Sequence, residues 1–296
     1  MKRAAMIVAT LGIAACSFAL SSFAQSNDKP ASPGGQGTQP AGQAAGQTAA
    51  PALGKRPPQA KTQPEFDAYK VAAALTDPAA QEKAADDFAA KFPDSELRPV
   101  LYKAAMHGYQ QANNADKMMD TSRKVLNYDA DDPEALLGVA QVLAERTRDT
   151  DLDKDQRLAE ARKDAERALV TVDTDIPTAG QPPERIEAYK GFLRSEAYAI
   201  LGTLEYSAKA WAAAEGDLRK SIEAFPQQVD PVAVLRLSIA LDNQNKVPEA
   251  LKYANQAVDL TKEETAAGKA ARAEKDRLTK LSSGTAPSQN PTPPKN

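Results

Sequence analysis

The sequence predicts an all-α protein in which successive helical hairpins stack into a solenoid. Three observations support this fold class. The middle of the 296-residue chain is rich in Ala, Leu, Glu, Lys and Arg, which are good helix formers. Bulky and small residues recur there at a helical spacing, and the same unit is repeated along the chain. Prolines stand mostly at the two ends and at expected helix starts, such as Pro133, Pro183 and Pro231.

Composition and charge exclude several function classes. The formal net charge is −3, so there is no basic excess that would attract nucleic acid. The chain has one cysteine, Cys16, and one histidine, His107, which is too few for a Cys/His zinc site, a Cys–His nucleophile pair or an internal disulfide. It also lacks the G-x-S-x-G and H-E-x-x-H motifs and a phosphate-binding glycine loop. The sequence therefore predicts a protein that is not an enzyme and that uses no cofactor or metal.

Residues 1–24 have the pattern of a secretory signal peptide. A short basic start precedes an apolar run, and small residues stand where a signal peptidase would cut, after Ala24. The residues I-A-A-C that end at Cys16 resemble a bacterial lipoprotein signal, and in this alternative Cys16 is acylated and attaches the chain to a membrane. A membrane-spanning anchor is disfavoured, because about 17 weakly apolar residues fall short of the roughly 20 that cross a bilayer. Both signal types predict export to the periplasm or the exterior.

Two segments outside the helical part have too few apolar residues to form a core. Residues 25–62 are rich in Gln, Ala, Gly and Pro, and residues 283–296 contain four prolines. Such segments cannot offset the conformational entropy that ordering would cost. We therefore expect a disordered linker and a disordered tail on either side of a folded domain formed by residues 63–282.

A two-helix unit recurs between residues 64 and 260. Each copy has an anchor residue on its first helix and a packing residue on its second helix. The separation between anchor and packing residue is identical in three copies, whereas the copy that starts at Leu136 carries an insertion between them. The anchors of the first two copies lie about 34 residues apart, a period that is typical of helical repeat arrays. The pairs are Tyr102–Met118, Leu136–Ala161, Tyr198–Ala214 and Val234–Ala250.

The third copy resembles the tetratricopeptide (TPR) signature, W-x2-L-G-x2-Y…A-x3-F…P. Tyr198 stands for the first aromatic, Leu201 and Gly202 match directly, and Ala214 is the small residue, whereas Glu205 departs from the second aromatic. The segment F-P-D-S-E at residues 92–96 is similar to the turn between hairpins in cell-envelope members of this family. The resemblance implies a right-handed α-solenoid of about five hairpins, the first one degenerate, with a polar C-terminal capping helix.

Stacking explains the types of residue in the repeat. One hairpin cannot cover its own apolar face, so neighbouring hairpins must pack on it, and small residues let helices approach closely. Trp211, which lies among alanines, is interpreted as a plug between helices. The residues expected to pack the repeats are Tyr102, Tyr109, Leu136, Ala140, Ala161, Tyr198, Leu201, Gly202, Ala214, Leu237, Ala250 and Ala257.

An acidic stretch from Asp149 to Glu160 has two interpretations. Its carboxylates have the spacing of an EF-hand calcium loop, but Lys154 replaces the glycine that the sharp turn requires. The favoured alternative is a solvated loop in which Asp153 or Asp155 caps the next helix.

A polar stripe on the first helix of each hairpin is the candidate binding surface. In the TPR family this side lines the inner face, and a groove of amides, hydroxyls and a few charges suits an extended polar peptide. A plain solvated helix face is the alternative. We predict a non-enzymatic scaffold of the cell envelope that binds a protein partner on its concave face, with a lipid-anchored assembly subunit at the outer membrane as the alternative. The candidate residues are Lys103, His107, Gln111, Gln141, Glu145, Thr203, Tyr206 and Asn243.

Overall fold

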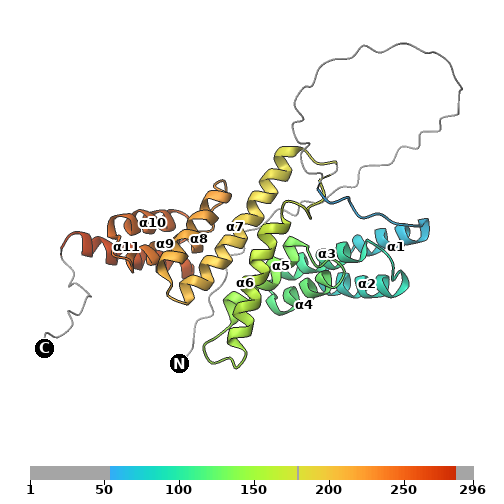
Figure 1. Cartoon of the computed structure of the whole chain (residues 1–296), viewed down its shortest axis with the longest axis horizontal. Helices are drawn as coiled ribbons and strands as arrows, with labels where there is room; N and C mark the ends of the chain where they lie inside the picture. The colour runs from blue at the N-terminus through green and yellow to red at the C-terminus, as the bar shows by residue number, and fades with distance from the viewer. Residues whose placement is uncertain (1–53, 179, 285–296) are drawn as a thin grey trace, which may run out of the picture.

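The computed structural model describes residues 54–178 and 180–284, and it has eleven helices and no strand within those ranges (Figure 1). The predicted signal peptide with Cys16, residues 25–53 of the predicted linker and residues 285–296 of the predicted tail lie outside the described residues. No helix in the described ranges has the length and apolarity needed to cross a bilayer.

The helices follow one another with short connections except near residue 175, where a longer loop separates the third hairpin from the fourth. Their bounds are α1 (Gln63–Ala73), α2 (Pro78–Lys91), α3 (Arg98–Gln111), α4 (Ala115–Leu126), α5 (Pro133–Arg146), α6 (Lys154–Thr171), α7 (Pro183–Ser207), α8 (Trp211–Ala224), α9 (Pro231–Asp242), α10 (Val247–Asp259) and α11 (Ala266–Ser282).

Each helix packs against the next, which gives five consecutive hairpins from α1–α2 to α9–α10. Helix α11 packs on both α9 and α10 and closes the C-terminal end of the array. The predicted all-α solenoid of five hairpins with a capping helix is confirmed. Three expected helix starts are also confirmed, because α5, α7 and α9 begin at Pro133, Pro183 and Pro231.

The odd-numbered helices form the inner layer of the array. Helix α1 contacts α3, α5 contacts α7, α7 contacts α9 and α9 contacts α11, whereas no two even-numbered helices in the described part contact each other to a similar extent. In a curved stack, helices on the inside of the bend approach one another and those on the outside separate. The inner face is therefore formed by α3, α5, α7 and α9.

The core continues from one hairpin to the next because the inner helices bury residues on two sides. Helix α5 places Ala135 and Val142 in the cluster shared with α2–α4, and Leu136 and Val139 in the cluster shared with α6 and α7. All twelve predicted packing residues are buried except Tyr198, which is half-buried. The Tyr198 ring packs against the edge of the core, with the Lys220 ammonium 5.2 Å from its centroid.

Helix α7 is longer than the repeat predicts. Tyr198 lies about four helical turns after Pro183, the first residue of α7, whereas Leu136 lies in the first turn of α5. The long helices α6 and α7 lie side by side in the middle of the array (Figure 1). Near the end of α7, Trp211 is half-buried and meets Tyr206 edge-on at 5.6 Å between ring centroids, in keeping with its interpretation as a plug.

The acidic stretch between α5 and α6 does not have the form of a calcium loop. Helix α6 begins at Lys154, so Glu160 lies in its second turn, and Lys154 Nζ is 2.7 Å from Asp149 Oδ1. Asp153 holds the N-cap position, but its side chain accepts no backbone hydrogen bond, so the predicted side-chain cap is wrong. Within the described residues, no three His, Cys, Asp or Glu side chains are placed to hold a metal ion.

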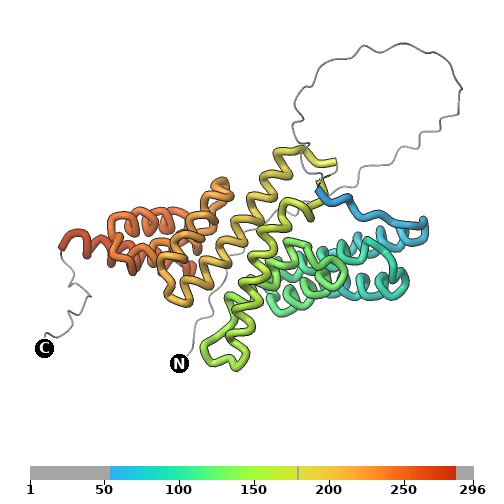
Figure 2. Tube along the Cα trace, in the orientation of Figure 1, coloured from blue at the N-terminus to red at the C-terminus, as the bar shows by residue number. Residues whose placement is uncertain are grey.

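Residues 54–61 form an extended strap, although the sequence assigns them to a disordered linker. Lys55 donates its backbone N–H to Thr174 at 3.1 Å, and its ammonium lies 2.5 Å from Asp129 and 3.5 Å from Asp175. Gly54 approaches the chain so closely that a Cβ there would lie 2.6 Å from the carbonyl oxygen of Ile176. The strap runs from the loop between α6 and α7 across the hairpin ends to α1 (Figure 2). The strap is ordered because it bonds to three of the loops that join one hairpin to the next.

Replacing Lys55 with alanine should release the strap without unfolding the array. The lost ion pairs are partly exposed, so we expect the free energy of unfolding to fall by less than about 1 kcal/mol. Hydrogen–deuterium exchange of residues 54–61 should nevertheless become much faster. Lys83→Ala, which removes an exposed ion pair within α2, is the control and should leave strap exchange unchanged. If residues 54–61 exchanged at the same rate in both variants, the Lys55 ion pairs would not be what holds the strap in place.

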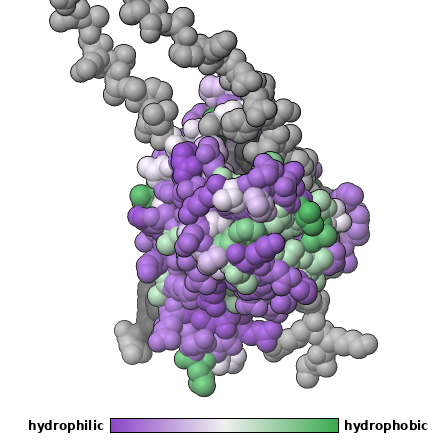
Figure 3. All heavy atoms as spheres, turned by 90° about the vertical axis from the view of Figure 1, so that its right-hand side faces the viewer, coloured by the Kyte–Doolittle hydropathy of each residue, from purple (hydrophilic) through white to green (hydrophobic). Residues whose placement is uncertain are grey.

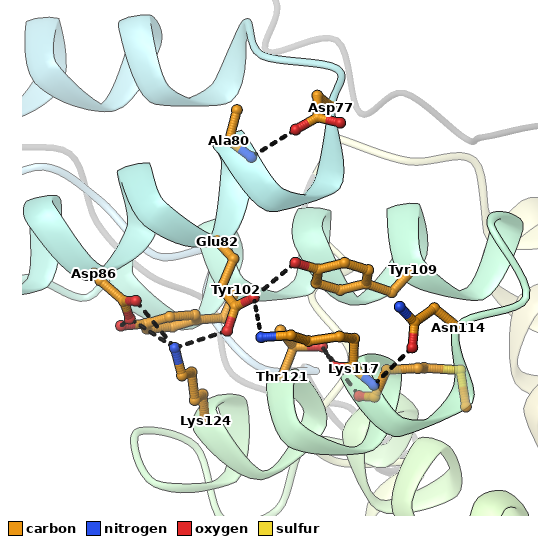
Figure 4. Close-up of polar contacts among 11 residues, drawn as sticks. Asp77, Ala80, Glu82, Asp86, Tyr102, Tyr109, Asn114, Lys117, Thr121 and Lys124 are labelled. Carbon is orange, nitrogen blue, oxygen red and sulfur yellow. Dashed lines mark hydrogen bonds and ion pairs between the residues drawn. The ribbon is translucent and has the colours of Figure 1, made fainter.

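A polar network joins the first two hairpins (Figure 4). Glu82 on α2 accepts hydrogen bonds from the Tyr109 hydroxyl at 2.7 Å and from the ammonium groups of Lys117 and Lys124 at 3.2 and 3.0 Å. Burial alone would raise the pKa of Glu82, but the hydrogen bonds from Tyr109 and the two lysines lower it. The network therefore fixes the angle between α2 and the following hairpin with side chains from three helices.

Within residues 54–178, no helix precedes α1 at the N-terminal end of the array. The end-on view shows a mostly hydrophilic surface with apolar side chains in small, separate groups (Figure 3). Phe66, Val71 and Leu75 at this end are exposed. The charged α11 at the other end has no comparably exposed large apolar side chain.

Candidate binding face

A cluster of charged side chains lies on the inner face between α3 and α5. Lys103 of α3 extends its ammonium group to Asp132 Oδ2 at 3.0 Å and to Glu134 Oε1 at 2.5 Å. Asp132 also accepts the backbone N–H of Ala135 at 3.0 Å, so it caps α5 at the same time. This pairing explains why charged groups are tolerated where only 24% of the Lys103 side chain and 17% of the Glu134 side chain remain exposed.

Glu134 is saturated with partners. His107 Nε2 lies 2.7 Å from Glu134 Oε2, and the Tyr189 hydroxyl of α7 interacts with the same carboxylate. Burial alone would raise the pKa of Glu134, but the Lys103 ammonium and the hydrogen bond from His107 hold it well below its usual value. Burial raises the pKa of Tyr189 far above its usual value, and the Glu134 charge adds to this. In this cluster, Lys103, His107 and Tyr189 thus all interact with the Glu134 carboxylate.

A second polar group lies further along the inner face, on α5, α7 and α9. Arg236 donates to Thr203 Oγ1 at 2.7 Å, and the Thr203 hydroxyl donates to the Ala199 carbonyl at 2.7 Å. Glu145 lies within electrostatic reach of Arg236 and receives a hydrogen bond from Gln141. These residues come from three successive inner helices, so the polar surface is continuous across the middle of the array.

Glu196 lies between these two groups and has no partner among the described residues. No hydrogen bond or ion pair is made by its carboxyl group within the described part of the chain. Burial raises the pKa of Glu196 to about 8, and the negative charges of Glu134 and Asp230 act in the same direction. The residue is still partly accessible to solvent.

Five of the eight candidate residues lie in one of these two polar groups. Lys103 and His107 belong to the first group, and Gln141, Glu145 and Thr203 belong to the second. Tyr206 is nearby but is packed against Trp211. Gln111 is exposed at the end of α3, and Asn243 follows α9, where its amide donates to the Ile239 carbonyl at 2.8 Å. The structure therefore groups Gln111 and Asn243 with neither polar cluster. Whether any of the eight binds a partner stays a prediction.

The sequence reasoning missed several residues of this face. Tyr189, Glu196 and Thr203 recur at a heptad spacing, so they lie on one side of α7. Counting back by the same spacing from Thr203, which was a predicted site residue, would have identified Glu196 and Tyr189. Asp132 and Asp230 directly precede the prolines at which α5 and α9 begin. The missed residues are Asp132, Glu134, Tyr189, Glu196, Asp230 and Arg236.

Comparison with known proteins gives little further information. No family model matches the chain, and no curated protein matches it. One solved structure with some likeness is the Assembly Chaperone of RpL4 (Acl4), residues 1–338, at 15% identity and a TM-score of 0.33, over 74% of this chain and 99% of that chain. A likeness of this size identifies neither a family nor a function.

Proposed function

We propose that this chain is a non-enzymatic scaffold of the tetratricopeptide type, which binds a polypeptide partner along the inner face of its solenoid. The observation that carries this proposal is the continuous polar surface on α3, α5, α7 and α9. Its side chains come from successive repeats, and several remain partly exposed, so they can meet a bound chain. Extended peptides bind such grooves through repeated polar contacts along their length.

We also propose that the scaffold works outside the cytoplasm. The pattern of residues 1–24 supports this, and two forms of the exported protein are distinguishable by mass spectrometry of the mature chain. A mature N-terminus at Gln25 would support a protein released after signal cleavage. An acylated Cys16 at the N-terminus would instead support the alternative, a lipid-anchored assembly subunit at the outer membrane.

Site-specific photo-cross-linking tests the binding function. A photoreactive amino acid is placed at Gln141 on the inner helix α5 and, in a matched variant, at Lys163 on the outer helix α6. In cells that produce the chain, irradiation should give a defined polypeptide adduct from position 141 and none from position 163. Adducts from both positions would indicate unspecific contact, and the absence of an adduct from position 141 would overturn the proposed function.

A further inference from the structure

We propose that the inner face takes up a polypeptide segment carrying lysine or arginine, with one basic side chain of that segment paired to Glu196. This inference rests on the proposed function and adds the chemistry of the partner. It is carried by the arrangement of charges along the array.

Glu134 and Glu196 hold the same position in successive repeats. Each lies two residues before the anchor of its hairpin, Leu136 or Tyr198. The cation that pairs with Glu134 is Lys103, one residue after the preceding anchor, Tyr102. The chain therefore supplies the counter-charge of Glu134 from the preceding repeat.

The corresponding counter-charge for Glu196 is missing. The residue one place after the anchor Leu136 is Leu137, and the residue that corresponds to His107 is Gln141. Neither of them carries a positive charge. The glutamate at this repeat position is therefore paired with a cation in the α5–α6 hairpin but not in the α7–α8 hairpin.

No other cation of the inner face, within the part of the chain that the structure describes, compensates for this. Lys103 is engaged by Asp132 and Glu134, and Arg236 donates to Thr203. The charges that act on Glu196 are those of Glu134 and Asp230, both negative. An unpaired carboxyl group beside the charges of Glu134 and Asp230 is complementary to a basic side chain and not to the phosphates of nucleic acid, so the partner is a basic polypeptide segment.

Binding of a cation should change the protonation of Glu196. Because burial raises its pKa to about 8, the carboxyl is mostly protonated at pH 7 in the free chain. A lysine ammonium placed against it favours the carboxylate, and the proton goes to the buffer. Recognition at this residue therefore predicts proton release to the buffer when the segment binds.

Isothermal titration of the full chain at pH 7 tests this inference. The probe is hexalysine blocked at both ends, and the control peptide is the same hexamer with acetylated lysines. We expect Glu196→Gln to weaken hexalysine binding by about tenfold, the effect of one well-placed ion pair. Glu223→Gln removes the same charge from the exposed surface of the outer helix α8 and should leave the affinity within about twofold. Titration in buffers of different ionisation enthalpy should show proton release with the unmodified chain and not with Glu196→Gln.

The inference is overturned if hexalysine fails to bind, if the two variants bind it equally well, or if binding releases no proton. These outcomes are separate from the fate of the proposed function. A cross-linked partner at Gln141 together with hexalysine binding that is insensitive to Glu196 would retain the scaffold and reject a basic partner. The absence of that cross-link would reject the scaffold itself.

Discussion

Replacing Gly202 with leucine is expected to lower the free energy of unfolding by about 3 kcal/mol, or roughly 5–10 °C in Tm. Gly202 lies at the crossing of α7 and α8, where a Cβ would be 2.7 Å from Leu218 Cγ and 3.2 Å from the Leu218 backbone nitrogen. The side chain of Leu218 is fully buried and has no free space to move into. The helices would have to separate, which would disturb the core on both sides. Thermal unfolding followed by circular dichroism measures the effect.

Gly216 is the matched control for this substitution. It lies in α8, close to Leu218 in the chain, and nothing beyond its own turn of helix lies within 4 Å of a Cβ built there. Gly216→Ala should therefore stabilise the chain by about 0.5–1 kcal/mol, the usual gain when a helix loses an interior glycine. If Gly202→Leu unfolded at the wild-type temperature, α7 and α8 would not cross at Gly202.

Replacing Glu196 with glutamine is expected to stabilise the protein at alkaline pH by about 1–3 kcal/mol, a value reduced from full linkage because the group is partly solvated. The folded-state pKa of about 8 lies above the ordinary value of 4.5 for a glutamate. The contribution of Glu196 to stability is therefore complete below pH 4.5 and is lost as the pH rises through 8. Glutamine does not ionise and avoids this loss.

The pH dependence distinguishes this effect from a general change in packing. The difference in Tm between Glu196→Gln and the unmodified chain should be near zero at pH 4, grow between pH 4.5 and 8, and stay constant above pH 8. Glu223→Gln on the outer surface should show no such pH-dependent difference. A constant difference at all pH values would mean that Glu196 is not held neutral in the folded chain.

The repeat was predictable because its packing requirement appears directly in residue spacing. The regular separation of anchor and packing residue places Tyr198 on one helix and Ala214 on the next, and both helices, α7 and α8, form as expected. The same period gave the anchors Tyr102 and Leu136, both of which are buried. Periodicity works here because a hairpin can bury its apolar face only against an equivalent hairpin.

The binding face was only partly predictable because its contacts cross from one repeat to the next. Lys103 and His107 were found together since they lie one turn apart on α3, but Glu134, which joins them, comes from α5. Contacts of this kind depend on how far successive hairpins are rotated, and residue spacing within one hairpin does not determine that rotation. The strap was missed for a related reason, because Lys55 is ordered by Asp129 and Asp175, which lie far along the chain.

The path of the strap determines where any upstream attachment would pull. Since Gly54 lies against Ile176 and Thr178, the chain joins the folded part between the third and fourth hairpins and not at the tip formed by α1. A load applied through the N-terminus would reach the array near its midpoint, through the Lys55 ion pairs, before it reached α1.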